Sequence, residues 1–427
     1  MTKALRTVRG MHDILPPESA AWQWLEGQVR ALMDAYGYAE IRTPLLERTE
    51  LFKRSIGEVT DIVEKEMYTF EDRNGDSLSL RPENTASVVR AGVENGLLHN
   101  ATRRLWYTGP MFRHERPQKG RYRQFHQVGV ETFGMAGPDV DLELLLLGER
   151  LWRRLGLDAA VTLEVNSLGT PESRQAYRDA LIAHFEPHVD RLDEHERHRL
   201  HENPLRLLDS KNPDLAEVIA AAPSLIDSLD DESRRQFDWI LAGLDAAGVD
   251  YRVNPRLVRG LDYYTGAVFE WTTDRLGAQG TVCAGGRYDG LVEQLGGRGT
   301  PAAGFALGIE RLLALIEAEG QWPEPRPPHA CLVLAGERAT LEGLLVAERL
   351  REALPWLRLE SLCGGGSLKS QFRRADRSGA AFALVMGDDE IAAGTVAIKP
   401  LRAEGTQESV PVTELADRLA TVVAEQA

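Results

Sequence analysis

Apolar side chains recur at three- and four-residue spacing over residues 20–36, which predicts an amphipathic helix that ends at Gly37. The apolar positions of this helix are Trp22, Leu25, Val29, Met33 and Tyr36. A Leu-rich helix is predicted over residues 138–155. Another is predicted to begin at Pro82, because proline is favoured at the first position of a helix.

Strand patterns and turn signals separate these helices. Residues 67–81 predict a hairpin with its turn at Asn74-Gly75, and residues 104–134 predict two strands joined by a basic loop. Residues 170–247 are polar, helical in pattern and poor in β-branched runs, so we interpret them as a helical insertion. Further strands are expected at 38–44, 161–166, 252–258, 266–273 and 280–285.

The proline-rich stretch 322–328 predicts a stiff linker. Beyond it, apolar strands alternate with amphipathic helices, which indicates a separate α/β domain. We therefore predict an α+β domain with an antiparallel sheet over residues 1–325, carrying the insertion, and an α/β domain over 326–427. The strands of the second domain are expected at 331–335, 381–386 and 395–399, and its helices at 337–353, 367–378 and 412–425.

Composition limits the cellular setting. The 427 residues are 43% hydrophobic and 27% charged, as in globular proteins. The start of the chain lacks the apolar core of a secretory signal, and no stretch approaches the ~20 apolar residues of a membrane helix. The three cysteines form no CxxC pair, which fits a reducing cytosol, so we expect a cytoplasmic protein. The net charge of −15 means that nucleic-acid binding requires local basic patches.

The most informative segment is 111–134. In an extended strand, Gln127, Gly129 and Glu131 share one face, whereas Val128 and Val130 point the other way into packing. An amide and a carboxylate around a glycine that leaves room above the sheet form a floor for a small molecule. The loop before this strand carries five cations, which suit a polyphosphate or an RNA end: Arg113, Arg116, Lys119, Arg121 and Arg123. A solvated hairpin tip is the alternative, because charged loop tips are common.

Glu83 and Thr85 fall in the first turn of the helix predicted from Pro82, where the helix dipole favours a carboxylate. They form either a capped helix start or a site for an ammonium group.

Arg259 lies in an apolar strand, where a guanidinium is costly to bury without an anionic partner. Tyr263 and Tyr264 follow and offer flat walls with hydroxyl groups. A structural pair between Arg259 and Asp262 beside core tyrosines is the alternative.

Arg311 lies near the start of a predicted helix, where the dipole disfavours a cation. Glu310 or a nucleotide phosphate should compensate for it. The glycine-rich stretch 284–290 permits close backbone approach to a ligand and matches no P-loop. His195, His198 and His201 recur every three residues, but their charged surroundings indicate a solvated helix face rather than a metal site.

Together these segments resemble the histidyl-tRNA synthetase family, a class II aminoacyl-tRNA synthetase family, over essentially the whole chain. Residues 41–52 resemble class II motif 1, 111–134 motif 2 and 301–315 motif 3, while 257–266 and 284–291 resemble the two histidine-specific motifs. Arg9-Gly10 and residues 13–16 resemble the opening of the family. The resemblance implies a class II catalytic domain, a C-terminal anticodon-binding domain and a homodimer.

The resemblance also implies roles for individual residues in histidine binding. Glu83, Thr85 and Gln127 would hold the α-amino group of histidine. Glu131 and Tyr264 would read the imidazole, and Tyr263 would wall the pocket. Asn84 departs from the usual glycine of the family and leaves these residues intact.

For ATP, the resemblance implies that Arg113 and Arg259 are catalytic, bind the α-phosphate and also contact histidine. Arg259 would take a place that many class II enzymes give to a metal. Arg311 would hold the γ-phosphate with help from Arg121, and Gln118 would approach the tRNA acceptor end.

The implied reaction is the attachment of L-histidine to its tRNA through a histidyl-adenylate. Mg²⁺ would accompany ATP, with no protein-held metal, no organic cofactor, and neither DNA nor membrane as a partner. The alternative is a non-catalytic, histidine-sensing regulatory relative from histidine biosynthesis, which should lack the phosphate-binding arginines and the C-terminal domain.

Overall fold

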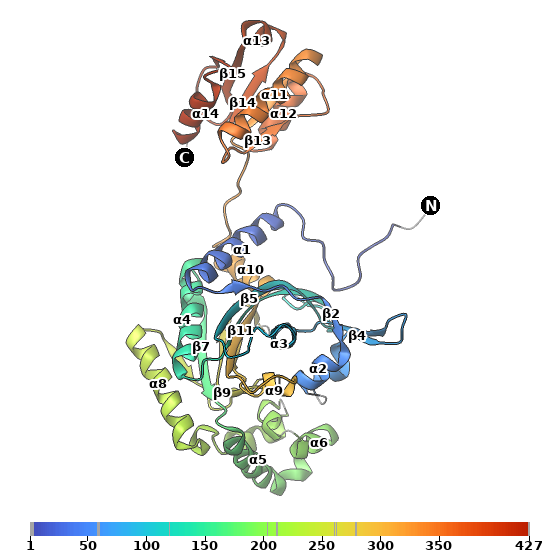
Figure 1. The fold of residues 1–427 in the computed structure, drawn as a ribbon, viewed down its shortest axis with the longest axis vertical. Coiled ribbons are helices and arrows are strands. Elements are labelled where there is room, and N and C mark those ends of the chain that lie inside the picture. Colours follow the sequence, from blue (N-terminus) through green and yellow to red (C-terminus); the bar gives the residue numbers. More distant parts are fainter. Residues whose placement is uncertain are drawn as a thin grey trace. The chain divides into compact units, whose positions relative to one another are not determined.

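The computed structural model describes residues 4–57, 60–118, 120–202, 204–210, 212–259, 261, 263–277 and 280–425. The chain divides into two compact units, Met1–Pro323 and Glu324–Ala427 (Figure 1). Among the described residues, the model contains no helix with the length and apolar character needed to cross a membrane.

An eight-stranded sheet in the order β1-β5-β6-β11-β10-β9-β7-β8 forms the centre of the first unit. Neighbouring strands run antiparallel except for the pairs β1–β5 and β7–β8, which are parallel. The predicted antiparallel sheet is therefore confirmed. The strands are β1 (Ala39–Glu40), β5 (Arg103–Phe112), β6 (Gln124–Phe133), β7 (Thr162–Ser167), β8 (Tyr251–Val253), β9 (Thr265–Thr272), β10 (Thr281–Arg287) and β11 (Ala302–Gly308).

The two faces of this sheet bury different sets of residues, as the alternation along β6 predicts. Val128 and Val130 join a core with apolar side chains of α1 (Glu18–Ala35), α4 (Pro138–Leu155), α8 (Asp231–Ala247) and α10 (Ile309–Ala318). Phe133 packs in a second core on the other side with Tyr107 of β5. That second side also holds the candidate site.

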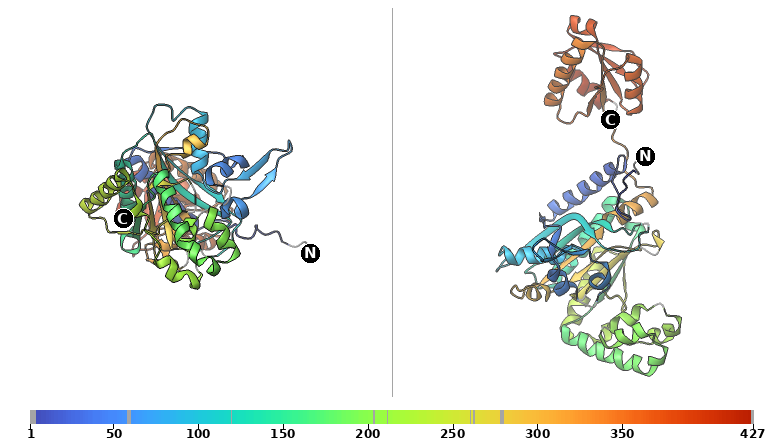
Figure 2. Two further views of the ribbon diagram at one scale, coloured as in Figure 1. Left: turned by 90° about the horizontal axis from the view of Figure 1, so that it is seen from below. Right: turned by 90° about the vertical axis from the view of Figure 1, so that its right-hand side faces the viewer.

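Smaller elements surround the sheet. A three-stranded sheet in the order β2-β4-β3 contains the predicted hairpin, which projects from the first unit (Figure 2). Its strands are β2 (Leu46–Arg48), β3 (Thr69–Glu71) and β4 (Ser77–Leu80). The neighbouring helices are α2 (Thr49–Ile56), the π-helix η1 (Ile62–Glu66), α3 (Thr85–Glu94), the 3₁₀ helix η2 (Asp158–Ala160) and α9 (Leu291–Gln294).

The bounds of several predicted elements were wrong. The strand expected at 38–44 covers only Ala39–Glu40. Helix α3 begins at Thr85 rather than Pro82, with Asn84 as its N-cap, because the carboxylate of Glu83 accepts from the first backbone N–H groups of the helix. The strand expected at 252–258 ends at Val253, since the backbone turns where Leu257 N–H bonds to the carbonyl of Asn254.

The predicted insertion is helical, but its last helix, α8, packs on the central sheet. Phe237, Ile240 and Leu244 of α8 are buried in the core that contains α4. The earlier helices pack instead beside Tyr263 and Tyr264. They are α5 (Pro171–Phe185), η3 (Glu186–Arg191), α6 (Glu194–Glu202), η4 (Pro204–Asp209), η5 (Pro213–Leu215), α7 (Ala216–Ala220) and η6 (Ile226–Ser228).

The second unit is a five-stranded mixed sheet in the order β13-β12-β14-β15-β16. Its three expected strands and three expected helices are present, and β13, β16 and α13 were not predicted because they are short. The strands are β12 (Ala330–Leu334), β13 (Leu359–Ser361), β14 (Phe382–Met386), β15 (Thr395–Pro400) and β16 (Glu408–Pro411). The helices are α11 (Glu337–Ala353), α12 (Leu368–Arg377), α13 (Asp388–Ala393) and α14 (Leu415–Ala424).

A buried ion pair ties the sheet to the start of α4. Arg287 of β10 pairs with Asp141, and its guanidinium also donates to the carbonyl oxygens of Met135 at 3.3 Å and Gly137 at 2.9 Å. Asp141→Ala would leave this buried guanidinium with only Asp289 as a counterion, a partly exposed carboxylate whose Oδ1 lies 3.2 Å from Arg287 Nη1. We expect a loss of about 3–5 kcal/mol in the free energy of unfolding, measured by urea denaturation.

The double variant Asp141→Leu/Arg287→Met removes both charges and serves as the control. It should recover most of the loss, because no unpaired charge remains. An unchanged urea midpoint for Asp141→Ala would show that the pair does not stabilise the fold.

Candidate functional site

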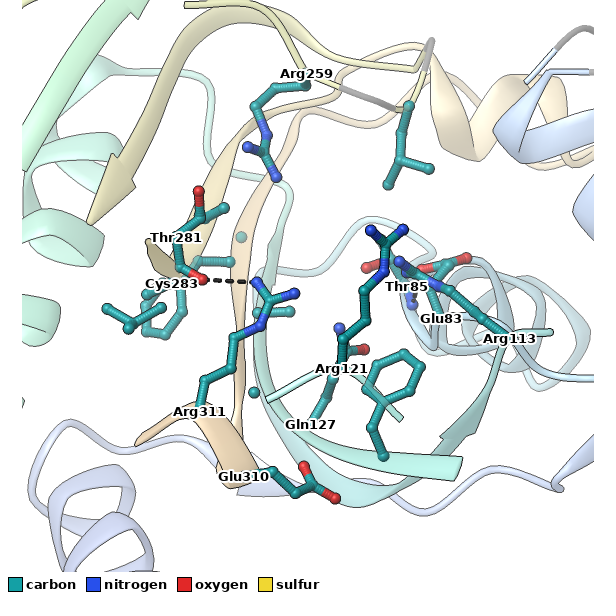
Figure 3. A pocket seen from close by; sticks show the side chains of 18 of the residues that line it. Glu83, Thr85, Arg113, Arg121, Gln127, Arg259, Thr281, Cys283, Glu310 and Arg311 are labelled. Carbon is teal, nitrogen blue, oxygen red and sulfur yellow. Dashed lines mark hydrogen bonds between the residues drawn. The ribbon is translucent and has the colours of Figure 1, made fainter. Parts of the chain in front are cut away.

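A cavity of about 190 Å³ lies on the sheet where β6, β10 and β11 run side by side. Strand β6 supplies its floor, since Gln127 and Glu131 point into it. The start of α3, the motif 2 loop (residues 113–123) and residues 259–264 contribute the walls. Figure 3 shows arginine side chains from the motif 2 loop, from residues 259–264 and from α10 directed into the same space.

Glu131 forms the carboxylate end of the cavity. It is 1% exposed, and Thr85 Oγ1 donates to its Oε1 at 2.7 Å, while the Tyr288 hydroxyl bonds to Oε2. Burial raises the pKa of Glu131 to about 8, against the opposing effect of these two hydrogen bonds. The carboxyl is therefore ready to exchange a proton with a ligand near neutral pH.

Gly129 does not leave open space for a ligand, which corrects our prediction. A Cβ atom added there would lie 2.1 Å from Tyr107 Cζ, so the ring of Tyr107 occupies the space above the glycine. The two residues are cross-strand neighbours on β5 and β6. Gly129 thus admits an aromatic wall of the cavity rather than the ligand itself.

Glu83 both caps α3 and lines the cavity. Its carboxylate accepts from the backbone N–H groups of Thr85 at 2.6 Å and Ala86 at 3.1 Å. Burial raises the pKa of this carboxyl. Both interpretations of this segment therefore apply to the same side chain: a helix cap and a carboxylate facing a ligand site.

Gln127 faces Glu83 and Thr85 across the floor. Its Oε1 atom is buried and has no hydrogen-bond partner within the part of the chain that the structure describes. A buried carbonyl oxygen without a partner is unfavourable. Gln127 is therefore well suited to accept from a ligand ammonium group.

Asn84 is fully buried beside this site. Its Oδ1 accepts from Thr43 Oγ1 at 2.6 Å and from an Arg81 Nη1 at 2.9 Å. The side chain points away from the ligand and joins α3 to the segment that resembles motif 1. Asn84, in place of the usual glycine of the family, therefore adds hydrogen bonds to Thr43 and Arg81.

Four arginines form the cationic end of the cavity, where Arg113 lies beside Glu83 and Thr85 (Figure 3): Arg113, Arg121, Arg259 and Arg311. Arg113 Nε donates to the Pro82 carbonyl at 2.9 Å. Burial and the neighbouring charges of Arg113 and Arg121 lower the pKa of Arg311. Like charges held this close in a buried site favour an anionic ligand.

Arg259 and Arg311 are oriented by different partners from those expected from sequence. Arg259 pairs with Glu270 of β9, while Asp262 lies outside the described residues. Arg311 donates to the carbonyl oxygens of Gly120 at 3.1 Å and Thr281 at 2.8 Å (Figure 3). Glu310 points away from Arg311 and accepts from the backbone and ring of His126, so it compensates for Arg311 only through its charge, which opposes the lowering of the Arg311 pKa.

The remaining predicted residues divide between the cavity and the loop. Tyr263 and Tyr264 line the cavity with ring centroids 4.7 Å apart. Among the described cations of the motif 2 loop, Arg113 and Arg121 line it, whereas Lys119 lies outside the described residues. Gln118 is not in its lining and pairs through its backbone with Arg121 at the loop tip.

Several site residues were missed from sequence. Tyr107 and Tyr288 flank Glu131, Glu115 pairs with Arg121, and Glu270 pairs with Arg259 while accepting from Thr281 Oγ1 at 2.9 Å. A glutamate in the apolar strand around Glu270 was the available signal. His198 of α6 pairs with the exposed Glu202, and no metal-binding group of three His, Cys, Asp or Glu occurs among the described residues.

Comparisons with known proteins agree with this geometry. A family model described as histidyl-tRNA synthetase matches residues 10–312, and an anticodon-binding-domain model matches residues 330–421. The chain is 61% identical over 412 residues to the histidine–tRNA ligase of Halorhodospira halophila, covering 96% of this chain and 97% of that protein.

Solved structures extend the similarity to the fold. The apo histidyl-tRNA synthetase of S. aureus matches with a TM-score of 0.82 and 36% identity, over 97% of this chain and 100% of that chain. The histidyl-tRNA synthetase of Nostoc sp. matches with a TM-score of 0.69 over 98% of this chain and 100% of that chain. At 20% identity, the second match concerns the fold alone.

The raised pKa of Glu131 makes the stability of the first unit depend on pH. The folded protein keeps this carboxyl protonated up to about pH 8, whereas the usual pKa of 4.5 applies in the unfolded chain. The stabilisation is complete below about pH 4.5. The stabilisation falls by up to about 1.4 kcal/mol per pH unit as the pH rises from about 4.5 to about 8, and it is fully lost above pH 8.

We expect Glu131→Gln, which cannot ionise, to remove this dependence. Its thermal midpoint should exceed that of the unmodified protein by a margin that grows between about pH 5 and pH 8, measured by scanning calorimetry. Glu352→Gln changes an exposed glutamate of the second unit and should follow the unmodified protein throughout. Parallel curves for Glu131→Gln and the unmodified protein would contradict a raised pKa.

Proposed function

The chain belongs to the histidyl-tRNA synthetase family and catalyses the ATP-dependent attachment of L-histidine to its tRNA, and we propose that the cavity on β6 is its active site. One observation carries this assignment. The same cavity is lined by the buried carboxyl groups of Glu83 and Glu131 and, adjoining them, by four arginines. An amino acid with a cationic amino group and a polyphosphate need opposite charges in adjoining positions.

Histidine would occupy the carboxylate end. Its ammonium group would bind Glu83, Thr85 and Gln127, the last through the unpartnered Oε1. Its imidazole would lie between Glu131 and Tyr264, with Tyr263 as a wall. Because the pKa of Glu131 is about 8, its carboxyl group and the facing ring nitrogen of histidine can share one proton in a hydrogen bond.

ATP would occupy the cationic end, with Arg113 and Arg259 at the α-phosphate. Both would also lie near the histidine carboxylate and act as the catalytic residues. Arg311 would hold the γ-phosphate, with Arg121 beside it. These buried guanidinium groups can bind phosphate oxygens in bidentate geometry.

Mg²⁺ would enter with ATP rather than on a protein cage. The carboxylates nearest the arginines, Glu115 and Glu270, are each paired with a guanidinium. Such a set of side chains fits a magnesium ion that takes most of its ligands from phosphate and water. The ion would neutralise charge on the polyphosphate.

The first reaction step joins the two substrates. A histidine carboxylate oxygen attacks the α-phosphorus, and the bond from that phosphorus to the oxygen bridging to the β-phosphate breaks, releasing pyrophosphate. Arg113 and Arg259 would stabilise the charge that develops on the phosphoryl oxygens. Positioning supplies much of the rate, which fits a site built from arginines.

In the second step the terminal hydroxyl of the tRNA attacks the carbonyl carbon of the histidyl-adenylate. The bond from this carbon to the phosphate oxygen breaks, AMP leaves, and the hydroxyl gives up its proton. We place Gln118, at the tip of the motif 2 loop, near the tRNA acceptor end. The second unit, which matches the anticodon-binding model, would hold the anticodon, with α12 (Arg373 and Arg374) as a candidate basic surface. We further propose a homodimer through the motif 1 segment and a cytoplasmic location, with no DNA partner.

A non-catalytic, histidine-sensing relative is not favoured. This chain keeps the cavity arginines and the second unit, and it matches a histidine–tRNA ligase over nearly its whole length. Histidine-dependent exchange of pyrophosphate into ATP tests the assignment directly. A protein that binds histidine without supporting exchange would be a sensor.

Glu131→Ala should abolish histidine activation, because the imidazole loses its carboxyl partner. We expect pyrophosphate exchange to fall by roughly 10³-fold or more, with the Kd for ATP unchanged in calorimetric titration. Glu352→Ala is the control and should exchange normally. Near-normal exchange by Glu131→Ala would remove Glu131 from the histidine site.

Glu270→Gln tests the orientation of Arg259. Without the carboxylate, Arg259 should sample other rotamers, and kcat for exchange should fall by roughly 10–100-fold. The control is Glu319→Gln, which breaks the partly exposed pair with Arg275 (3.1 Å) outside the cavity. Equal kcat values for the two variants would show that Glu270 does not orient Arg259.

A further inference from the structure

The N-terminal segment carries sequence features to which the reaction assigns no role. Residues 4–9 are exposed, and the next residue, Gly10, is buried. It belongs to the Arg9-Gly10 pair that resembles the opening of the family. We call residues 9–14 the N-terminal strap, because they lie against the outside of the motif 2 loop.

Backbone hydrogen bonds join the strap to the base of this loop. The carbonyl oxygen of Gly10 accepts from Arg123 N–H at 2.8 Å and from Gln124 N–H at 3.4 Å. These are the residues at which the loop rejoins β6. The ring of His12 packs edge-on against Tyr122, with centroids 5.0 Å apart. The last two loop residues, Tyr122 and Arg123, and the first residue of β6, Gln124, are therefore in contact with the strap.

The close approach requires glycine. Gly10 has a φ of +85°, a conformation that other residues rarely adopt. A Cβ atom added to it would lie 2.8 Å from Pro117 Cγ and 2.9 Å from Arg123 Cγ. Pro117 and Arg123 belong to opposite limbs of the loop, so a side chain at position 10 would push on both.

Other contacts also restrain the loop, among them the hydrogen bond of 2.6 Å from His114 N–H to the Glu66 carbonyl. Arg113 N–H bonds to the Arg123 carbonyl at 3.0 Å across the base. Arg311 Nε donates to the Gly120 carbonyl at 3.1 Å near the tip. The strap holds the outer side, so the loop is fixed between the strap and α10.

We propose that the N-terminal strap, with Gly10 at its centre, positions the motif 2 loop for ATP and the tRNA acceptor end. This inference rests on the proposed function, because it takes Arg121 as a phosphate ligand and Gln118 as a tRNA contact. The histidine end of the cavity is built by residues 127–131 of β6, α3 and residues 263–264. The strap reaches β6 only at Gln124, and among the described residues it makes no hydrogen bond or ring contact with the histidine end. Loosening the strap therefore affects ATP and tRNA and spares histidine.

The test compares Gly10→Ala with Gly75→Ala. Gly75 has a φ of +86°, and an added Cβ would meet nothing within 4 Å, so this control carries the same backbone strain without the clash. For Gly10→Ala we expect roughly 10–100-fold losses in kcat/KM for ATP and in the single-turnover rate of transfer to tRNA. The KM for histidine should stay within about twofold, and Gly75→Ala should resemble the unmodified protein.

A second variant keeps the test decisive if Gly10→Ala does not fold. His12→Ala leaves the strap backbone intact and removes only the contact with Tyr122, so a smaller loss in the same two quantities is expected. Equal losses in the KM for histidine and for ATP, or no loss in either strap variant, would overturn the proposal. Failure of the unmodified protein to exchange pyrophosphate would instead overturn the proposed function.

Discussion

The site depends on keeping ionisable groups buried together in one cavity. Each ionisable side chain there is held by a specific partner: Glu131 by two hydroxyl groups, Glu83 by backbone N–H groups and Arg259 by Glu270. Desolvation still dominates, as the raised pKa of Glu131 shows. A substrate that carries opposite charges offsets part of the free energy lost to desolvation when it binds.

The antiparallel sheet makes this arrangement possible. Its strand order places β6, β11, β10 and β9 next to one another, although β6 and β9 are separated by more than a hundred residues of chain. The intervening segment includes the helical insertion, whose earlier helices share a core with Tyr263 and Tyr264, while its last helix, α8, packs on the sheet. A rigid ladder of backbone hydrogen bonds thus holds the histidine and ATP ends in register, while loops at its margin provide contacts with larger partners.

Local rules predicted much of the fold. The spacing of apolar residues located α4 and α11 at their observed bounds, and the Asn74-Gly75 turn located the hairpin. The beginning of α3 was misplaced because a carboxylate cap at Glu83 can replace the expected proline start. Short strands such as β13 were missed, since three residues carry too little periodicity to be distinguished from a loop.

The sequence by itself determined which face of β6 carries Gln127 and Glu131, because alternation in a strand is local. It also identified the segments that supply the arginines, through their resemblance to a family. Only the tertiary structure decided that Tyr107 fills the space above Gly129, that Glu270 pairs with Arg259, and that Gly10 lies against the motif 2 loop. These contacts join residues far apart in the chain, and their partners are selected by strand order and packing, which no local pattern encodes.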